Sequence, residues 1–341
     1  MAKMKNITIT DVAKDAGVSI KTVSRVINQE KEVAAITREK VLKTIKKLDF
    51  KPNKDARGLR SKKSFLIGIV YDNPNKYYLS DIQSGALKAC AGTNYNIVLQ
   101  ECKYKSKDIN HVIGKFISNA GLNGIVLTPP LSDNAKLLGY LEKQNIFVSL
   151  IAPPNLSKFE LWASGNDEEA AMAMTNKIIA LGHKKIGFVY GHKDHSASHQ
   201  RYYGFHKALM EADIAINQNW IFKGDFSFDS GYKAAQSLFK LRSRPSALFC
   251  SNDSMAAGVI KYAYQNNKNI PKDLSITGFD DSMIAEEIWP SLTTVRQPVE
   301  AMAKHAIECI ISKIDPMSHK VPFSKVFSAE IITRESLIKK T

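Results

Sequence analysis

The chain is poor in the residues that build metal and disulfide sites, since only four of its 341 residues are cysteine. Cys90, Cys102, Cys250 and Cys309 are widely separated, no CxxC pair occurs, and none lies in the first 63 residues. This spacing argues against a zinc finger and favours reduced structural thiols in a reducing compartment. We expect neither a metal nor a cofactor.

Long apolar runs and common catalytic motifs are missing as well. Nowhere do 18 apolar residues follow one another, and the first ten residues, MAKMKNITIT, have no apolar segment behind their lysines. We therefore expect a soluble, cytoplasmic protein with no membrane partner. The motifs GxGxxG, GxxxxGK followed by Ser or Thr, GxSxG and HExxH are all absent. Their absence favours a protein that is not an enzyme.

Acidic residues are outnumbered at the start of the chain, where the positive charge is concentrated. Residues 1–63 contain 13 Lys and 4 Arg against 7 Asp or Glu, so they carry +10 of the formal net charge of +15. A concentrated positive field at one end favours a polyanionic partner such as DNA or RNA. An anionic membrane is the weakest candidate, because no membrane segment accompanies the charge.

The first 50 residues have the apolar spacing of three short helices. Apolar residues recur three or four positions apart, at Ile9, Val12, Ala13, Ala16, Val23, Val26, Ile27, Val41, Ile45 and Leu48. Thr8 or Thr10 is expected to cap the first helix, and Gly17 to end it. Ser19 is a good cap for the second helix, and Thr37 is the expected start of the third.

After residue 63 the pattern changes to strands alternating with helices. The segment 52–63, PNKDARGLRSKK, has one large apolar residue among five cationic ones and resembles a flexible linker. Beyond it, eight apolar strand-like segments, from FLIGIVYD to LSITGFD, alternate with helical stretches. This predicts an α/β fold, with two doubly wound Rossmann-like subdomains behind an all-α N-terminal domain.

The expected domain boundaries follow from these changes in pattern. The helical domain would occupy residues 1–51, a connecting segment 52–63 and the α/β core 64–341. Within the core the division falls near SGNDEE at 164–169. One subdomain would comprise 64–163 with 292–325, and the other 164–291 with 326–341.

The stretch SIKTVSRVIN, residues 19–28, follows a tight Gly-Val turn and is rich in short polar and cationic side chains. Two helices joined in this way are typical of a helix-turn-helix, whose second helix enters the major groove of DNA. Taken alone, the stretch is more typical of a surface helix with solvated polar groups. In the helix-turn-helix, Val23 and Ile27 would face inward. The outward residues would be Ile20, Lys21, Thr22, Ser24, Arg25 and Asn28.

Longer segments make the assignment more specific. ITITDVAKDAGVSIKTVSRVIN, followed by TREKVLKTIKKLDFKPNKDARGLRSKK, resembles the DNA-binding end of the LacI/GalR family of bacterial transcription regulators. SNDSMAAGVIKYAYQNNKNIPKDLSITGFDDS and WPSLTTVRQPVEAMAKHA are similar to the family's effector-binding core. One departure is Val33-Ala34, where relatives commonly carry Val-Ser, so a hydroxyl that could cap the third helix or contact phosphate is lost.

The resemblance implies a periplasmic-binding-protein-like core whose two subdomains are joined by three chain crossovers. It also implies that residues 53–60 form a hinge that folds on operator DNA, where Leu59 enters the minor groove. We expect a homodimer on a palindromic operator, because the sequence ends at ESLIKKT without the leucine-heptad tail of the family's tetramers. The expected DNA-binding residues are Thr8, Ser19, Ile20, Lys21, Thr22, Ser24, Arg25, Asn28, Asn53, Arg57, Leu59 and Arg60.

The resemblance also implies an effector site between the subdomains, at the carboxyl ends of strands. Aromatic rings with Arg and Asp side chains suit the apolar face and vicinal hydroxyls of a sugar. The protein would therefore be a sugar-responsive repressor of carbohydrate utilisation genes. Asn73 follows the first strand, and the family's ligand contacts correspond to Tyr77, Tyr78, Arg201, Phe226, Asp253 and Asp280.

Several alternatives remain open from sequence. The effector could be a purine or another metabolite, and the protein could be a nonspecific DNA-architectural protein or a free solute-binding module. Asp253 and Asp280 could serve a sugar hydrolase. The segment GHKDHSASH contains His195 and His199 at a spacing that can bind a metal, although in the family this loop leads toward the pocket.

Overall fold

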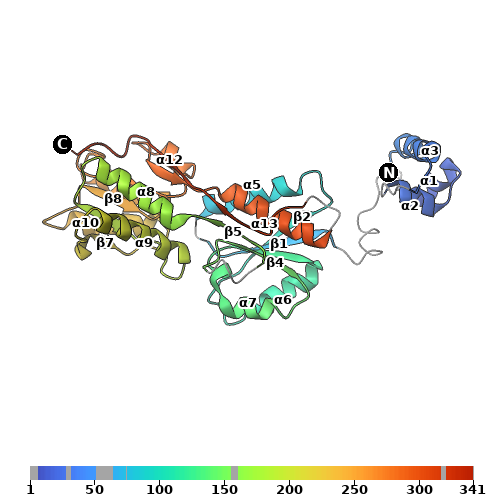
Figure 1. Cartoon of the computed structure of the whole chain (residues 1–341), viewed down its shortest axis with the longest axis horizontal. Coiled ribbons are helices and arrows are strands. Elements are labelled where there is room, and N and C mark those ends of the chain that lie inside the picture. The colour runs from blue at the N-terminus through green and yellow to red at the C-terminus, as the bar shows by residue number, and fades with distance from the viewer. Residues whose placement is uncertain are drawn as a thin grey trace, which may run out of the picture. The chain divides into compact units, whose positions relative to one another are not determined.

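The computed structural model describes residues 7–27, 32–50, 64–73, 75–154, 160–315 and 320–340. The chain divides into two compact units, Met1–Ser64 and Phe65–Thr341. The first unit is helical, and the second contains all the strands of the described residues (Figure 1).

Three helices form the first unit, and local signals set their ends. They are α1 (Ile9–Ala16), α2 (Ile20–Ile27) and α3 (Ala35–Lys47). Thr8 caps α1 through a reciprocal capping box with Asp11, and Gly17 ends it in the left-handed conformation at φ 60°. Both predictions are confirmed.

The predicted start of the third helix is wrong by two residues. The backbone N–H of Arg38 donates to the carbonyl of Ala34 at 3.0 Å, so helical hydrogen bonding is established before Thr37. Ala34 provides no side-chain cap, as expected from the missing hydroxyl. The three helices enclose a small core whose buried apolar members are Val12, Ala13, Ala16, Val23, Val26, Val41 and Phe50.

The second unit contains two parallel sheets and a short antiparallel pair. The first sheet has the order β11-β5-β4-β3-β1-β2, and the second has the order β7-β6-β8-β9. The strands of the first sheet are β1 (Leu66–Tyr71), β2 (Asn96–Glu101), β3 (Gly124–Leu127), β4 (Phe147–Ile151), β5 (Trp162–Gly165) and β11 (Ser324–Phe327). The second sheet comprises β6 (Ile186–Val189), β7 (Ile221–Phe222), β8 (Ala247–Cys250) and β9 (Ser275–Thr277). β10 (Thr294–Arg296) pairs antiparallel with β12 (Glu330–Ile332).

Helices cover these sheets, as continuously apolar strands require. Every residue of β3, β6 and β8 is buried, which is typical of parallel strands covered on both faces. The predicted α/β fold class is therefore confirmed. The helices are α5 (Lys76–Cys90), α6 (Ile109–Ala120), α7 (Ala135–Leu141), α8 (Asp167–Ala180), α9 (Ser196–Glu211), α10 (Phe228–Phe239), α11 (Asp253–Gln265), α12 (Ile284–Glu287) and α13 (Val299–Ile314). Short 3-10 turns occupy Leu131–Asp133 and Gln218–Trp220.

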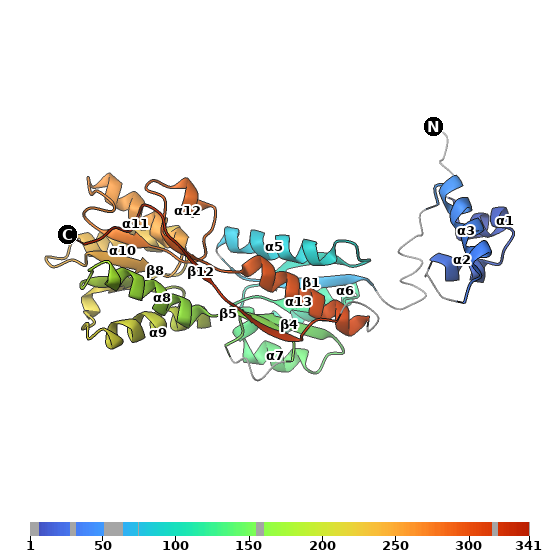
Figure 2. The same cartoon turned by 45° about the horizontal axis from the view of Figure 1, so that its top comes forward.

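The chain crosses between the two subdomains three times (Figure 2). It crosses after β5, after β10 and after β11. Two predicted boundaries need correction: residues 292–296 belong to the second subdomain, because Leu292 and Val295 complete its hydrophobic clusters. Val326 and Phe327 belong to the first, because β11 pairs with β5.

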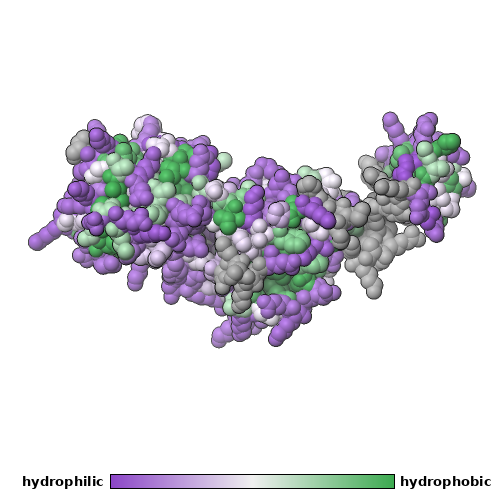
Figure 3. Space-filling view, viewed as in Figure 1, coloured by the Kyte–Doolittle hydropathy of each residue, from purple (hydrophilic) through white to green (hydrophobic). Residues whose placement is uncertain are grey.

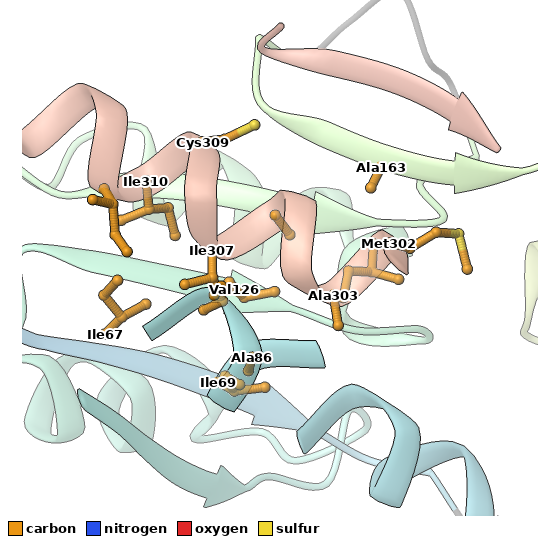
Figure 4. Packing of buried hydrophobic residues seen from close by; sticks show 14 of the residues in the cluster. Ile67, Ile69, Ala86, Val126, Ala163, Met302, Ala303, Ile307, Cys309 and Ile310 are labelled. Carbon is orange, nitrogen blue, oxygen red and sulfur yellow. The ribbon is translucent and has the colours of Figure 1, made fainter. Parts of the chain in front are cut away.

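Helix α13 shows how the returning chain completes the first subdomain. Its Ile307 and Ile310 pack over Ile67 of β1 and Val126 of β3, with Ala86 of α5 nearby (Figure 4). These side chains are almost completely buried. A segment that is more than 200 residues from β1 in the sequence is therefore essential to the same core.

Helices α5 and α13 approach closely at Gly85. A Cβ atom placed there would lie 2.1 Å from the carbonyl oxygen of Glu300. We expect Gly85→Ala to force the helices apart and to lower the free energy of unfolding of the core by about 1–3 kcal/mol. Urea denaturation followed by circular dichroism measures this change.

Gly139→Ala in α7 is the matched control, because a Cβ at Gly139 meets nothing within 4 Å. There we expect no loss of stability and a gain of up to about 1 kcal/mol from helix propensity. Equal effects of the two substitutions would contradict the close approach.

Candidate nucleic-acid interface and effector cavity

The second helix of the head begins at a side-chain cap. Ser19 Oγ accepts a hydrogen bond from the backbone N–H of Thr22 at 3.1 Å, and the two hydroxyls lie 2.9 Å apart. This confirms Ser19 as the cap and holds the start of α2 directly after the Gly17 turn. Helix α2 therefore follows α1 in the arrangement that a helix-turn-helix requires.

The exposed face of α2 contains the residues predicted to read DNA. Ser19, Ile20 and Lys21 are exposed, while Thr22, Ser24 and Arg25 are half-buried. The inward face differs from the prediction in one detail. Val26 is buried with Val23, whereas Ile27 is only half-buried.

Two of the residues predicted to contact DNA already interact with other side chains of the helical unit. The Thr8 hydroxyl donates to Asp11 Oδ2 at 2.7 Å as part of the cap, so its local role is to orient α1. Arg25 Nη2 lies 3.4 Å from Glu32 Oε2, in a pair that remains largely exposed to solvent. Such a pair contributes little in water and leaves the guanidinium able to exchange partners. The predicted contacts Asn28, Asn53, Arg57, Leu59 and Arg60 lie outside the described residues.

In the core, a cavity lies between the two subdomains at the carboxyl ends of the strands. The space between its walls is about 420 Å³, including the part open to solvent. Five of the seven predicted effector residues line it: Asn73, Tyr78, Arg201, Phe226 and Asp280. Five polar residues of the wall that we did not predict are Asn75, Asp167, His195, Asn252 and Gln297.

Tyr77 and Asp253 do not line this cavity. The Asp253 carboxylate is fully buried and accepts hydrogen bonds from the Ser282 backbone N–H at 2.8 Å and from the Thr294 hydroxyl at 2.5 Å. It therefore ties the start of α11 to the segment that follows β9 and to the first residue of β10. Burial raises the pKa of Asp253, and the nearby Asp280 carboxyl raises it further.

The neighbouring Asn252 occupies the wall in place of Asp253. Its Oδ1 accepts from the Met255 N–H at 2.9 Å and caps α11, while its Nδ2 donates to the Phe226 carbonyl at 3.0 Å. Sequence reasoning selected Asp253 from this Asn-Asp pair after β8 and missed Asn252. Asn and Asp are about equally favoured as N-caps, so no local signal in the sequence indicated that Asn252, and not Asp253, would line the wall.

Arg201 is the central cation of the cavity and is only 4% exposed. Its Nε donates to Asp167 Oδ2 at 2.9 Å, and its Nη1 donates to the Ser251 carbonyl at 2.5 Å and reaches Asp280 Oδ1 at 3.5 Å. The guanidinium carbon lies 3.8 Å from the centre of the Phe279 ring. Within the described part of the chain, Nη2 has no hydrogen-bond partner, so it is available to a ligand.

Asp280 connects the two subdomains across the cavity. Its Oδ2 accepts from Asn75 Nδ2 at 3.0 Å, and its Oδ1, the oxygen that Arg201 reaches, accepts from Gln297 Nε2 at 2.8 Å. Burial raises the pKa of the Asp280 carboxyl, and the Arg201 guanidinium opposes that rise. A ligand that hydrogen-bonds to Asp280 would therefore act at the junction of the two subdomains.

Parts of the cavity wall are held in an unusual backbone conformation. Ala152, Phe226 and Asp280 line it with φ values of 46°, 70° and 115°, although none is glycine. Such conformations cost about 1–3 kcal/mol each and persist where surrounding structure imposes them, often at ligand sites. The wall is therefore shaped at the expense of local stability.

The histidine-containing segment contributes a neutral side chain to the wall. His195 packs against Phe226 with ring centres 5.3 Å apart, and burial lowers its pKa to about 3. His199 lies on α9, where its Nε2 is 2.8 Å from the Lys193 carbonyl. No group of three or more His, Cys, Asp or Glu side chains that could hold a metal ion occurs among the described residues.

Residues 8–53 match the family model "Bacterial regulatory proteins, lacI family", and residues 175–337 match "Periplasmic binding protein-like domain". The chain is also 31% identical to the HTH-type transcriptional repressor PurR of Aliivibrio salmonicida, over 97% of this chain and 99% of the relative. The chain belongs to the LacI family. It is accordingly a DNA-binding transcription regulator and not an enzyme.

Solved structures agree with this LacI-family fold. A lac repressor dimer bound to operator and the anti-inducer ONPF has a TM-score of 0.80 at 23% identity, over 98% of this chain and 100% of that chain. A complex of the transcriptional regulator CelR with cellobiose has a TM-score of 0.72 at 25% identity, over 97% of this chain and 99% of that chain. No helix of the described residues is long and apolar enough to span a membrane.

Lys21, near the start of the recognition helix, should contribute to sequence preference. Lysine can donate to guanine O6 and N7 in the major groove, a contact worth about 1–3 kcal/mol of discrimination. We expect Lys21→Ala to relax preference at one position of each half-site. Selection of bound duplexes from a randomised pool, followed by sequencing, measures the effect.

Lys14→Ala removes the same charge from the exposed C-terminal end of α1 and serves as the control. It should leave the selected sequence unchanged and at most weaken binding to all duplexes alike. If Lys21→Ala behaves as Lys14→Ala does, Lys21 contacts phosphate and not bases.

Proposed function

We propose that this LacI-family protein represses genes of carbohydrate utilisation, binding a palindromic operator as a homodimer and responding to a small sugar in the interlobe cavity. The observation that carries the sugar assignment is the chemistry of the cavity wall. Sugar hydroxyls both donate and accept hydrogen bonds, and the wall offers carboxylates, carboxamides and a guanidinium around two aromatic rings. A protein that acts on chromosomal DNA would work in the cytoplasm.

Arg201 and Asp167 form the part of the wall best suited to vicinal hydroxyls. Arg201 Nη2 is a donor, and Asp167 Oδ1, whose partner oxygen is held by Arg201, is an acceptor beside it. Phe226 and Tyr78 supply apolar surface for the C–H face of a sugar ring. The likeness to the CelR complex, at 25% identity, supports a carbohydrate.

A purine is the alternative effector, favoured by 31% identity to a PurR repressor. A planar base has two broad apolar faces and forms its hydrogen bonds only along its edge. Sugar hydroxyls project around the whole ring, so they can pair with polar groups on several sides of this wall, where an unpaired buried polar group is costly.

The junction between the subdomains suggests how binding would reach the DNA. Besides the contacts of Asp280, Asp133 Oδ2 accepts from the Ser196 N–H at 2.9 Å, and the Tyr104 hydroxyl donates to Asp194. A sugar that competes for Asp280 would change the relative stability of two arrangements of the subdomains. Its effect on operator affinity is limited to its differential affinity for those arrangements.

Exposed apolar side chains along one edge of the core support the homodimer. Leu87 lies on α5, and Met283 and Trp289 flank α12, with 66% and 70% of the last two exposed. Figures 1 and 2 show α5 and α12 along the same edge of the core. On the face shown in Figure 3, hydrophobic residues reach the surface in separate clusters among hydrophilic ones. Burying the Met283–Trp289 cluster between two copies would remove it from water.

The effector proposal is tested by first identifying the ligand and then weakening its binding with a substitution in the cavity wall. A thermal-shift screen of mono- and disaccharides identifies the compound. Purine bases are included in the same screen as the alternative effector class. We expect Asp167→Asn to reduce the affinity for the identified compound about tenfold or more, because a charge-assisted hydrogen bond is lost. Isothermal titration calorimetry measures the affinity.

Asp229→Asn, on the first turn of α10 away from the cavity, should bind the compound as the wild type does. Operator affinity without the compound should be unchanged in both variants. Stabilisation by a purine and by no sugar would refute the carbohydrate assignment.

The homodimer is tested by placing a charge at Met283. We expect Met283→Lys to shift the protein toward monomer at micromolar concentration, because a buried unpaired ammonium disfavours the interface. Sedimentation velocity measures the distribution. Met210→Lys on α9 is the control, since Met210 is similarly exposed, at 62%, and α9 lies on the opposite edge of the core. A dimer that survives Met283→Lys and is lost in Met210→Lys would place the interface on α9.

A further inference from the structure

A second hollow lies at the opposite end of the second sheet from the effector cavity. Lys185, Ser246 and Leu274 line it and come immediately before β6, β8 and β9. Asn252 and Asp280 of the effector cavity instead follow the carboxyl ends of β8 and β9. These strands are three or four residues long, so about 10–13 Å of sheet separates the two sites.

The wall of this hollow is strongly cationic. Its only acidic residue among the lining side chains, Asp273, already accepts a hydrogen bond from the Asn269 N–H at 2.7 Å. The chain end contributes to the wall, and Figures 1 and 2 show that end on the side of the second subdomain facing away from the first. The cations are Lys184, Lys185, Arg242, Arg244, Lys268 and Lys340.

None of these six cations takes part in an ion pair with any described residue. Elsewhere in the core some lysines do pair with carboxylates; Lys88 Nζ, for example, lies 2.6 Å from Glu300 Oε1. The six residues therefore line one concavity with no ion-pair partner among the described residues.

Helix ends account for part of this charge. Helices α8, α10 and α11 end beside the hollow, and each helix C-terminus carries a partial negative charge of about one half. Together with Asp273 they offset fewer than half of the six positive charges. A surplus of about 3.5 positive charges remains, and it faces a space of about 1330 Å³ that includes open solvent.

The combination of guanidinium and ammonium groups indicates the kind of anion that the hollow would bind. Guanidinium groups offer planar forks that match phosphate oxygens, and ammonium groups add compact positive charges beside them. The Arg244 guanidinium lies 5.8 Å from the centre of the Phe239 ring, which helps to hold it at the wall. The cations surround a concavity and do not form a stripe along one face, so the shape favours a small ligand over a nucleic acid duplex.

We infer that this cationic hollow is a second ligand site, which binds a small anion carrying two or more phosphate groups. It is separate from the effector cavity and from the DNA-binding head. Its occupant would add a second metabolic signal to the regulator.

Calorimetric titration of the full chain with inorganic triphosphate, at constant ionic strength, tests the inference. The test variant is Arg242→Gln with Arg244→Gln. The control is Lys233→Gln with Lys261→Gln, which removes two charges from exposed positions of α10 and α11 outside the hollow. Any binding to the basic head is common to all three proteins, so their difference reports on the hollow.

We expect wild type and control to bind triphosphate alike and the test variant to bind it about tenfold or more weakly. Triphosphate should also slow hydrogen exchange of residues 240–246 in the wild type but not in the test variant. Equal affinities in all three proteins would overturn the inference. Sulfate that competes with triphosphate as well as triphosphate itself would also overturn it. So would a test variant whose affinity falls only for a DNA duplex or for polyglutamate.

Discussion

The buried guanidinium of Arg201 is the interaction on which the effector cavity depends. Two carboxylates, Asp167 and Asp280, lie in a region that excludes most water, and Arg201 is the cation that offsets them. Its hydrogen bond to the Ser251 carbonyl and its position over Phe279 hold it in one place. Removing one partner from such a buried group leaves uncompensated charge, which costs far more than an exposed pair contributes.

The hydrogen bonds of this cluster also join the two subdomains of the core. Arg201 and Asp280 belong to the second subdomain, whereas Asn75 belongs to the first and Gln297 lies on a crossing segment. The strained φ of Asp280 shows that the surrounding chain imposes its orientation. Polar contacts at a junction can exchange partners at modest cost, while the apolar packing of each subdomain resists change. The structure therefore concentrates adaptable interactions where a ligand would bind.

Local sequence signals were sufficient for the first two helices of the head and for the alternation of strands and helices. The Thr8 cap, the Gly17 stop and the Ser19 cap depend on interactions within a few residues. They failed at α3, where no side-chain cap exists and the hydrogen bond from the Arg38 N–H to the Ala34 carbonyl marks the start. Identification of the candidate site was less complete. Strand ends marked its general position, but Asp167, Asn75 and Gln297 come from distant segments, and only folding brings them to Arg201.

The sequence by itself determined the class of each unit, because helix and strand periodicity, caps and charge are properties of short segments. It also determined the family, because long ordered segments identify it. Only the tertiary structure decided which member of the pair Asn252-Asp253 lines the cavity. Asn252 is the extended N-cap of α11 and Asp253 is its first helical residue, and in the folded chain Asn252 lines the cavity while Asp253 is buried against Ser282 and Thr294. The return of α13 to the first subdomain and the gathering of six cations around one hollow were decided in the same way, by contacts between residues far apart in the chain.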